Sequence, residues 1–239
     1  MNQAERFQNA GWTADNRLQI IAGPCAIEGE EMAFKIAEKI KLITESLKIP
    51  FIFKGSYRKA NRSRLDSFTG IGDKQALEIL KKVGLHFNIP TVTDIHSKEE
   101  AAMAAEYVDV LQIPAFLSRQ TDLLLAAGET QKPVNIKKGQ FLSPKDMMKV
   151  AEKVSSTGNE NIFLCERGTS FGYNTLINDF RGLEIMAETG YPVIFDATHS
   201  VQQPSILGEK SGGERQFIPS LSRAACAIGV SGLFIETHE

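Results

Sequence analysis

The chain alternates short apolar runs, rich in β-branched residues, with longer segments in which apolar residues recur every three or four positions. Runs of the first kind are typical of buried strands, and the second spacing is typical of one buried face of a helix. Their alternation indicates βαβ units on a parallel sheet. Strands are expected in eight places, at residues 18–22, 51–53, 91–93, 108–113, 134–136, 162–165, 193–195 and 233–235.

Helices are expected between these runs wherever an apolar stripe is visible. The longest stripe has steps of three to four and is expected to be buried throughout: Met32, Ile36, Ile40, Ile43 and Leu47. Shorter stripes predict helices around 77–83 and 147–154, the latter after a Ser143-Pro144 start signal. Further helices are expected over 176–189 and over 217–228, where Pro219 must lie in the first turn.

Eight strands separated by helices predict a (β/α)8 barrel, or TIM barrel, rather than an open doubly wound sheet. The length of 239 residues and the hydrophobic content of 42% are enough for one large core. Without a linker or repeat, we expect a single domain over 1–239, with 1–17 as an N-terminal extension and the barrel from about residue 18. The helix that should follow the last strand is missing, so we expect a truncated barrel or a polypeptide that continues beyond Glu239.

Composition excludes several classes of partner. Lys and Arg total 27 against 29 Asp and Glu, so no net field draws the protein to nucleic acid or to an anionic membrane. Residues 1–17 lack the apolar core of a secretory signal, and no apolar run is long enough to span a bilayer. The three cysteines are few and far apart, which disfavours a disulfide framework. A cytoplasmic location is expected.

Polar residues follow every predicted strand. Because the strands of such a barrel all end at one mouth, where its active sites lie, these residues are expected to converge. A structural role would explain any one of them about half of the time, but not all of them together. The strand exits are Cys25, Lys54, Asp94, Gln112, Lys137 with Lys138, Glu166 with Arg167, Asp196 with His199, and Glu236.

The cations of this ring, together with Lys59, predict a polyanionic ligand. Lysine and arginine clustered in a cleft bind phosphate and carboxylate through charge-assisted hydrogen bonds. The alternative is that these cations pair with Asp94, Glu166 and Asp196. The Gly70-Ile71-Gly72 segment lacks the rest of any nucleotide-binding motif.

Thiolate, imidazole and carboxylate among the strand exits predict a metal site. Cys25, His199 and Glu236, with His238 two residues further on, are typical ligands of a borderline divalent ion. In a closed barrel the first, seventh and eighth strands are neighbours, so three of these side chains can meet. The alternatives are a core role for Cys25 and a general base at His199. Packing or structural roles are expected for the remaining candidates, Cys165, Cys226, His86 and His96.

Several segments resemble the 3-deoxy-D-manno-octulosonate 8-phosphate synthase family, from about Leu18 to the end of the chain. The Lys-Ala-Asn-Arg-Ser and Arg-Gln-Thr-Asp elements are the most specific of them. The matching segments are Ala-Gly-Pro-Cys at 22–25, Phe-Lys at 53–54, Lys-Ala-Asn-Arg-Ser at 59–63, Gln-Ile-Pro-Ala-Phe-Leu at 112–117, Arg-Gln-Thr-Asp at 119–122, Asn-Ile-Lys-Lys-Gly-Gln-Phe at 135–141, Glu-Arg-Gly-Thr-Ser-Phe-Gly-Tyr at 166–173 and Phe-Asp-Ala-Thr-His-Ser at 195–200.

The resemblance implies a transferase of lipopolysaccharide biosynthesis. Its reaction is the aldol-like condensation of phosphoenolpyruvate with D-arabinose 5-phosphate and water, with release of inorganic phosphate. The family assembles as a homotetramer, and Cys25 places this chain in the metal-dependent branch, with a divalent ion such as zinc, iron or manganese. The implied ligands are Cys25, His199 and Glu236, with a fourth, an aspartate, beyond Glu239.

The resemblance also implies roles for individual residues. Phosphoenolpyruvate would be held by one group, with Lys54 and Gln140 nearby: Lys59, Lys137, Arg167 and His199. The sugar phosphate would be bound by Asn61, Arg62 and Ser63, with Arg62 reaching from a neighbouring subunit. Asp94 would position substrate or water, so the catalytic residues are expected to be Lys59, Asp94 and His199.

Three other functions fit parts of the pattern. The first is the sister enzyme that makes a heptulosonate phosphate from erythrose 4-phosphate, which the Lys-Ala-Asn-Arg-Ser segment disfavours. The second is a Schiff-base aldolase, in which a barrel lysine of lowered pKa is the nucleophile. The third is an inactive phosphosugar-binding regulator, which would bind both substrates without releasing phosphate.

Overall fold

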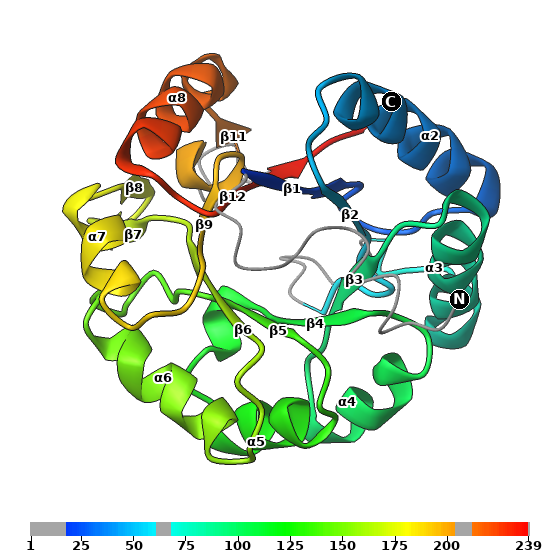
Figure 1. Ribbon diagram of the computed structural model, residues 1–239, viewed down its shortest axis with the longest axis horizontal. Coiled ribbons are helices and arrows are strands. Elements are labelled where there is room, and N and C mark those ends of the chain that lie inside the picture. The colour runs from blue at the N-terminus through cyan, green and yellow to red at the C-terminus, as the bar shows by residue number, and fades with distance from the viewer. Residues whose placement is uncertain (1–17, 61–67, 204–211, 239) are drawn as a thin grey trace.

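A closed barrel of eight parallel strands forms the centre of the protein (Figure 1). The computed structural model describes residues 18–60, 68–203 and 212–238. The barrel order is β1-β12-β9-β6-β5-β4-β3-β2. Each predicted strand overlaps one barrel strand, which confirms the predicted (β/α)8 barrel. The strands are β1 (Gln19–Gly23), β2 (Phe51–Lys54), β3 (Thr91–Asp94), β4 (Val110–Ile113), β5 (Val134–Lys137), β6 (Ile162–Glu166), β9 (Val193–Asp196) and β12 (Gly232–Glu236).

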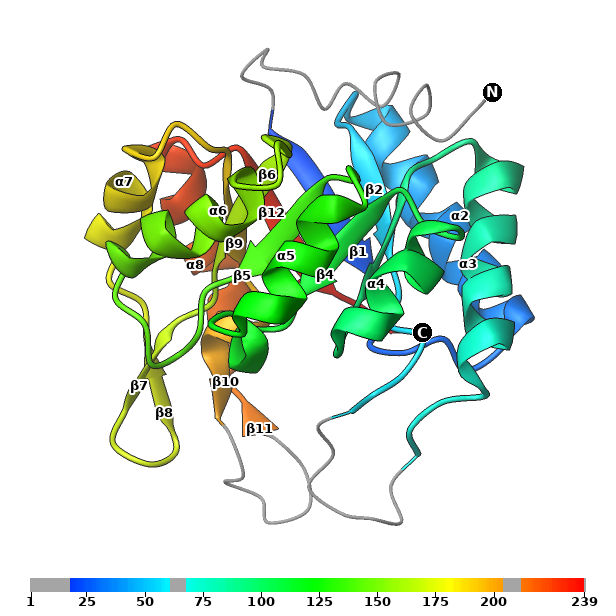
Figure 2. The same cartoon turned by 90° about the horizontal axis from the view of Figure 1, so that it is seen from below.

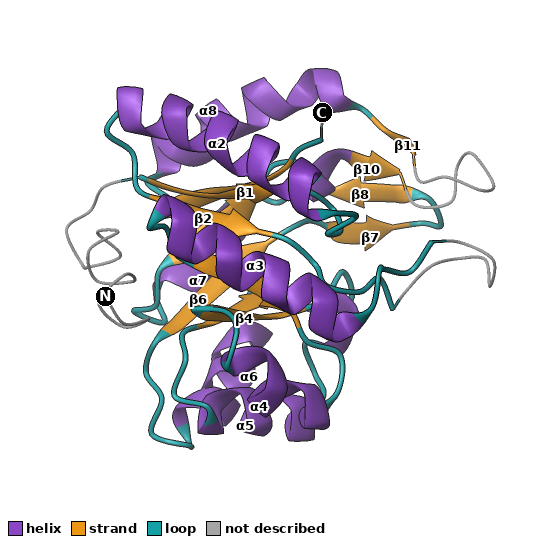
Figure 3. Cartoon of the chain, turned by 90° about the vertical axis from the view of Figure 1, so that its right-hand side faces the viewer, coloured by secondary structure: helices purple, strands orange, loops and turns teal. Residues whose placement is uncertain are grey.

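Helices surround the barrel, and Figure 3 shows α2 and α3 lying across β1 and β2. None of the described helices has the length and apolar character needed to cross a membrane. Short 3₁₀ helices follow three strands or loops: η1 (Ala115–Leu117), η2 (His199–Val201) and η3 (Arg215–Phe217). The α-helices are α2 (Glu30–Ser46), α3 (Asp73–Phe87), α4 (Lys98–Ala105), α5 (Thr121–Glu129), α6 (Asp146–Ser155), α7 (Arg181–Ala187) and α8 (Ile218–Ile228).

The helix predicted over 176–189 is wrong in its first part. Residues 175–177 form β8 (Thr175–Ile177), which pairs antiparallel with β7 (Thr169–Phe171), and α7 occupies only 181–187. The backbone groups of residues 175–177 pair with β7 across the hairpin, so they do not need a helix to form hydrogen bonds. A second hairpin joins β10 (Gln202–Gln203) to β11 (Gly212–Gly213). Both hairpins project from the same end of the barrel (Figure 2).

Two burial predictions are also wrong. The stripe on α2 is buried at Ile36 but exposed at its other end, where Ile43 and Leu47 are 52% and 61% exposed. Within the described residues no helix follows β12 to cover that end of α2. Cys226 is exposed on α8 rather than packed, whereas Cys165 is buried as expected. Residues 1–17, the predicted N-terminal extension, lie outside the described residues.

Two apolar layers hold the fold together. The larger lies between the outer face of the strands and the helices. The smaller fills the barrel interior, so the barrel is a packed core rather than a pore. Its members come from seven of the eight strands: Ile21, Ile52, Val92, Val110, Phe163, Cys165, Ile194 and Phe234. Polar side chains at the carboxyl ends of the strands therefore rest on a rigid apolar floor.

Candidate active site

One cavity of about 310 Å³ brings together most of the predicted site residues. Its charged and polar lining comes from the carboxyl ends of seven barrel strands and the loops after them. Asn61, Arg62 and Ser63 lie outside the described residues. The predicted residues that line the cavity are Lys54, Lys59, Asp94, Lys137, Gln140, Arg167, His199 and Glu236.

Lys54 is a buried cation at the end of β2. Its Nζ donates to the carbonyl oxygens of Pro24, at 3.3 Å, and Cys25, at 3.1 Å, and lies 3.6 Å from Glu236 Oε2. Burial, and then the nearby Lys59 ammonium, lower the pKa of Lys54. The close approach of β1 requires glycine at position 23, because a Cβ there would lie 1.9 Å from the Lys54 carbonyl oxygen. The loop that carries Cys25 is thereby pressed against Lys54.

Asp94 is held as a carboxylate by a chain of polar contacts. Asn135 Nδ2 donates to Gln112 Oε1 at 2.8 Å, and Gln112 Nε2 donates to Asp94 Oδ1 at 2.5 Å. The Ser56 hydroxyl donates to the other oxygen. Burial would raise the pKa of Asp94, but Lys54 and Lys59 hold it well below its usual range. Asp94 is therefore an acceptor at neutral pH and has no proton to give.

Lys59 keeps its positive charge. Burial alone would lower the pKa of Lys59, but Asp94, Cys25 and Glu236 raise it above its ordinary value. Its Nζ also donates to Ser56 Oγ at 3.1 Å. A half-buried cation that stays charged at the wall of a cavity favours an anion as its partner.

Asp196, at the end of β9, holds Lys137 and His199 in place. Its carboxylate accepts hydrogen bonds from the Lys137 ammonium and from the backbone N–H of His199 at 2.9 Å. It also contacts His199 Nδ1 at 2.8 Å. Burial opposes ionisation, but His199 and then Lys137 hold the pKa of Asp196 far below its usual range. Lys137 Nζ lies 3.4 Å from the centroid of the Phe234 ring, which fixes the ammonium against the apolar floor.

Arg167 and Gln140 have polar atoms that face no partner. Among the described residues, Arg167 Nη1 and Gln140 Oε1 are buried without a hydrogen bond, while Arg167 Nη2 donates to Gln202 Oε1 at 3.1 Å. Burial lowers the pKa of Arg167, and Asp196 opposes that shift. Buried polar groups are normally paired, so an unpaired guanidinium nitrogen at a cavity wall indicates a place for a ligand.

Two of the three predicted metal ligands lie side by side. His199 Nε2 is 3.6 Å from Glu236 Oε2, which has no hydrogen-bond partner among the described residues. The pKa of Glu236 falls to about 2, since Lys54 and His199 outweigh the effect of burial. Cys25 does not complete a group of three with them, because the described residues contain no such group that could hold a metal ion. His238 points elsewhere and lies 4.0 Å from Glu28.

The prediction from sequence missed some features of the site and misplaced others. Lys138 does not line the cavity, although it follows Lys137 in the chain. His96, for which only a structural role was expected, does line it, with Nδ1 3.1 Å from Glu100. The apolar wall formed by residues 114–117 was also missed, although these residues directly follow β4. His96 and residues 114–117 both lie in loops that follow predicted strands, but only the first residues of each loop were considered as site candidates.

Comparison with known proteins identifies the relatives of the chain. The profile of the DAHP synthetase I family matches residues 5–239. A protein from Acidithiobacillus ferrooxidans, named 2-dehydro-3-deoxyphosphooctonate aldolase, is 58% identical over 219 residues, which cover 92% of this chain and 78% of the relative. Proteins of the same name from Granulibacter bethesdensis and Bartonella henselae are 58% and 54% identical, over 96% and 100% of this chain and 82% and 85% of the relatives. The chain therefore belongs to the DAHP synthetase I family, among the members named 2-dehydro-3-deoxyphosphooctonate aldolase.

Proposed function

We propose that this chain catalyses the condensation of phosphoenolpyruvate with D-arabinose 5-phosphate and water. The products are 3-deoxy-D-manno-octulosonate 8-phosphate and inorganic phosphate, in lipopolysaccharide biosynthesis. The names of relatives up to 58% identical over most of the chain support this reaction. The observation in the structure that carries it is the set of cations around one cavity at the barrel mouth. These relatives disfavour the erythrose 4-phosphate enzyme and the inactive regulator.

Phosphoenolpyruvate is assigned to the side of the cavity formed by the ends of β5 and β6. Lys137 and Arg167 come from these neighbouring strands, and Lys59 comes from the loop after β2. The free Arg167 Nη1 and the charged Lys59 ammonium suit a phosphate and a carboxylate. His199 and Gln140 complete this side of the cavity. The sugar phosphate is assigned to Asn61, Arg62 and Ser63, on the basis of the motif alone.

The chemistry explains why so many fixed charges are needed. The enol carbon of phosphoenolpyruvate must meet the aldehyde carbon, and water must add to the carbon that bears the phosphate. Bringing two anionic substrates together costs electrostatic repulsion, which fixed cations offset while they also orient the reacting carbons. Asp94, a carboxylate at neutral pH, can accept a hydrogen bond from the attacking water or from a sugar hydroxyl. Lys59 and Lys137 neutralise the departing phosphate.

Phosphate release measures this function directly. Incubation with phosphoenolpyruvate and arabinose 5-phosphate is expected to release phosphate at least about a hundredfold faster than incubation with erythrose 4-phosphate, because a site built to bind a hydroxyl rejects an analogue that lacks it. Mass spectrometry of the eight-carbon product provides the control for simple hydrolysis. Equal rates with both sugars, or release without any sugar, would contradict the proposed reaction.

A divalent metal held by His199 and Glu236 is the second part of the proposal, with Cys25 as a third ligand that is assigned from the family resemblance alone. It is supported by the close pair of His199 and Glu236, by the unpaired Glu236 oxygen, and by β1, β12 and β9 being neighbours in the barrel. Asp196 contacts Nδ1 of His199, which leaves Nε2 free to face the ion. A carboxylate on the other ring nitrogen is usual for metal-bound histidine. A bound ion would supply Lewis acidity or a more acidic water.

Chelation tests the metal. Removal of bound metal is expected to lower the rate more than about tenfold, and Glu236→Gln is expected to lower both the metal content of the purified protein and the rate. Glu106→Gln, at an exposed position on the outer surface, is the matched control. Undiminished activity of metal-free protein would reject the metal, and an unchanged Glu236→Gln variant would remove that residue from the ligands.

Assembly and location follow from the same resemblance. We expect a homotetramer, which light scattering of the purified protein would detect, and a cytoplasmic location. The substrates are small phosphorylated molecules, so neither nucleic acid nor a membrane is expected as a partner.

A further inference from the structure

Lys138 is a fully buried cation that does not face the substrate cavity. Its Nζ donates to the carbonyl oxygen of Leu142 at 3.3 Å and to Thr169 Oγ1 at 3.0 Å. It also contacts the Gly139 carbonyl oxygen at 3.4 Å and forms an ion pair with Glu166 Oε1 at 3.3 Å. Its charge is therefore compensated by protein groups in the segments that follow β5 and β6.

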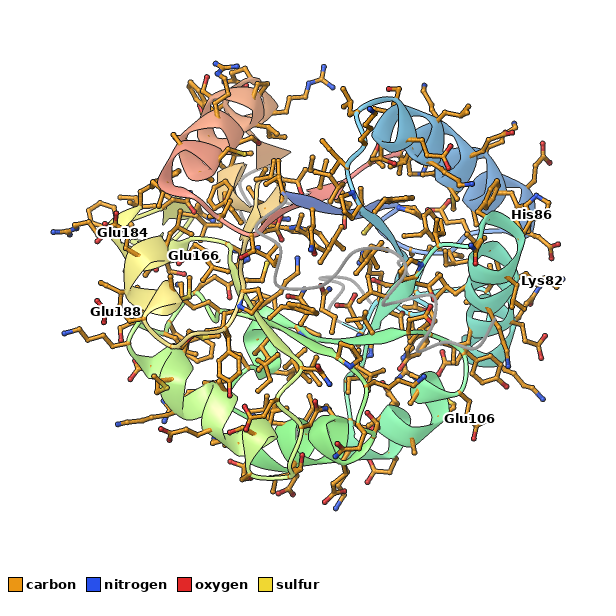
Figure 4. The ribbon with its side chains drawn as sticks, viewed as in Figure 1. Lys82, His86, Glu106, Glu166, Glu184 and Glu188 are labelled. Carbon is orange, nitrogen blue, oxygen red and sulfur yellow. The ribbon has the colours of Figure 1, made fainter. Side chains whose placement is uncertain are left out.

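Glu166, the last residue of β6, is the partner of Lys138. Its Oε1 also accepts hydrogen bonds from the backbone N–H groups of Arg167, at 2.8 Å, and Gly168, at 2.7 Å. The side chain is buried inside the ring of helices, whereas Glu184 of α7 and Glu188, which follows the last residue of α7, are exposed (Figure 4). One carboxylate oxygen thus fixes the backbone on which the Arg167 side chain is mounted.

The two loops joined by this ion pair carry the residues assigned to phosphoenolpyruvate. Lys137, the last residue of β5, precedes Lys138, Gln140 follows it in the next loop, and Arg167 follows Glu166. A backbone hydrogen bond from Ser170 N–H to the Gln140 carbonyl oxygen, at 3.0 Å, ties the same loops a second time. The distance between the amide of Gln140 and the guanidinium of Arg167 is therefore set by contacts that lie beneath the cavity wall.

We propose that Lys138 and Glu166 are a positioning pair for phosphoenolpyruvate, which holds Lys137, Gln140 and Arg167 at the spacing that its charged groups require. The inference rests on the proposed function of the site. A buried ion pair is weak support for stability, because replacing both partners with neutral residues of similar size is often harmless, whereas removing one partner strands a buried charge. Positioning therefore predicts that substrate binding and stability respond differently to single and double variants.

Single and double variants separate the effect on substrate binding from the effect on stability. Lys138→Met and Glu166→Gln alone are expected to lower the melting temperature and to weaken phosphoenolpyruvate binding, measured by calorimetry without sugar. The double variant is expected to regain most of the melting temperature but to keep a dissociation constant raised about tenfold, because the contacts to Leu142 and Thr169 remain broken. Its KM for phosphoenolpyruvate rises similarly, while its KM for arabinose 5-phosphate stays within about twofold of the parent.

A milder pair of variants guards against misfolding. Thr169→Val removes one acceptor of Lys138 and is expected to raise the phosphoenolpyruvate dissociation constant about threefold. Thr175→Val, on the facing strand of the same hairpin, is the control and is expected to leave it unchanged. Parent-like binding in the double variant and in Thr169→Val, or an equal loss for both substrates, would overturn the positioning pair. Failure of the parent protein to bind phosphoenolpyruvate would instead overturn the proposed function.

Discussion

Asp196→Asn is expected to lower kcat/KM by roughly 10²–10³-fold, which corresponds to a loss of about 2.7–4.1 kcal/mol of transition-state stabilisation. The asparagine side chain has nearly the same shape, so the fold around it is preserved. What is lost is the negative charge that faces Lys137 and His199, together with the acceptor that sets the orientation of the imidazole. Steady-state kinetics with both substrates, together with a melting curve, measure the effect.

A second buried aspartate provides the control for Asp196. Asp109 is buried beside the start of β3, where its Oδ2 accepts hydrogen bonds from the backbone N–H of Thr91 at 2.9 Å and from its hydroxyl at 3.2 Å. This is the end of the barrel opposite the mouth. Asp109→Asn is expected to lower the melting temperature while kcat/KM stays within about twofold of the parent. Equal kinetic losses in the two variants would show that Asp196 acts only through stability.

Arg167→Met is expected to raise the dissociation constant for phosphoenolpyruvate about a hundredfold. The guanidinium is buried, and its Nη1 has no hydrogen-bond partner among the described residues, so the substrate is the partner that the structure leaves for it. Methionine keeps much of the apolar volume but offers no donor. Arg167→Lys is expected to recover little, because an ammonium cannot reproduce the planar fork that binds two oxygens. Calorimetry with phosphoenolpyruvate alone measures both variants.

The surface arginine Arg181 is the matched control for Arg167. It begins α7, is 85% exposed and pairs with Asp179 at 2.7 Å, outside the cavity. Exposed ion pairs contribute little, so Arg181→Met is expected to bind phosphoenolpyruvate as the parent does. If Arg167→Met also binds like the parent, the assignment of the phosphoenolpyruvate side of the cavity is wrong.

The barrel was predictable because its strands are buried on both faces and therefore appear as continuous apolar runs. The same reasoning failed at 176–177, where Leu176 and Ile177 lie in a hairpin that projects from the barrel mouth. An apolar pair in a short segment does not distinguish a helix from a strand. At the end of α2, periodicity indicated a helix correctly, but burial depends on which element packs against it, and a stripe does not contain that information.

The site was predictable in position but not in orientation. Strand exits placed Lys137 and Lys138 at the mouth with equal weight, yet one faces the cavity and the other lies beneath its wall. Neighbouring residues leave a strand in opposite directions, and the sequence alone does not say which of the two points inward. The adjacency of Cys25, His199 and Glu236 followed from barrel closure, but only two of these side chains approach each other.

The apolar filling of the barrel has a kinetic consequence. Because Ile21, Ile52 and their neighbours fill the interior, the described residues leave no passage from the cavity through the barrel to its other end. Substrates must then enter and leave from the mouth side, so the reactant that binds deeper in the cavity is expected to bind first and the product formed there to leave last. We therefore expect the apolar filling of the barrel to influence the order of binding and release, although its side chains take no part in the chemistry.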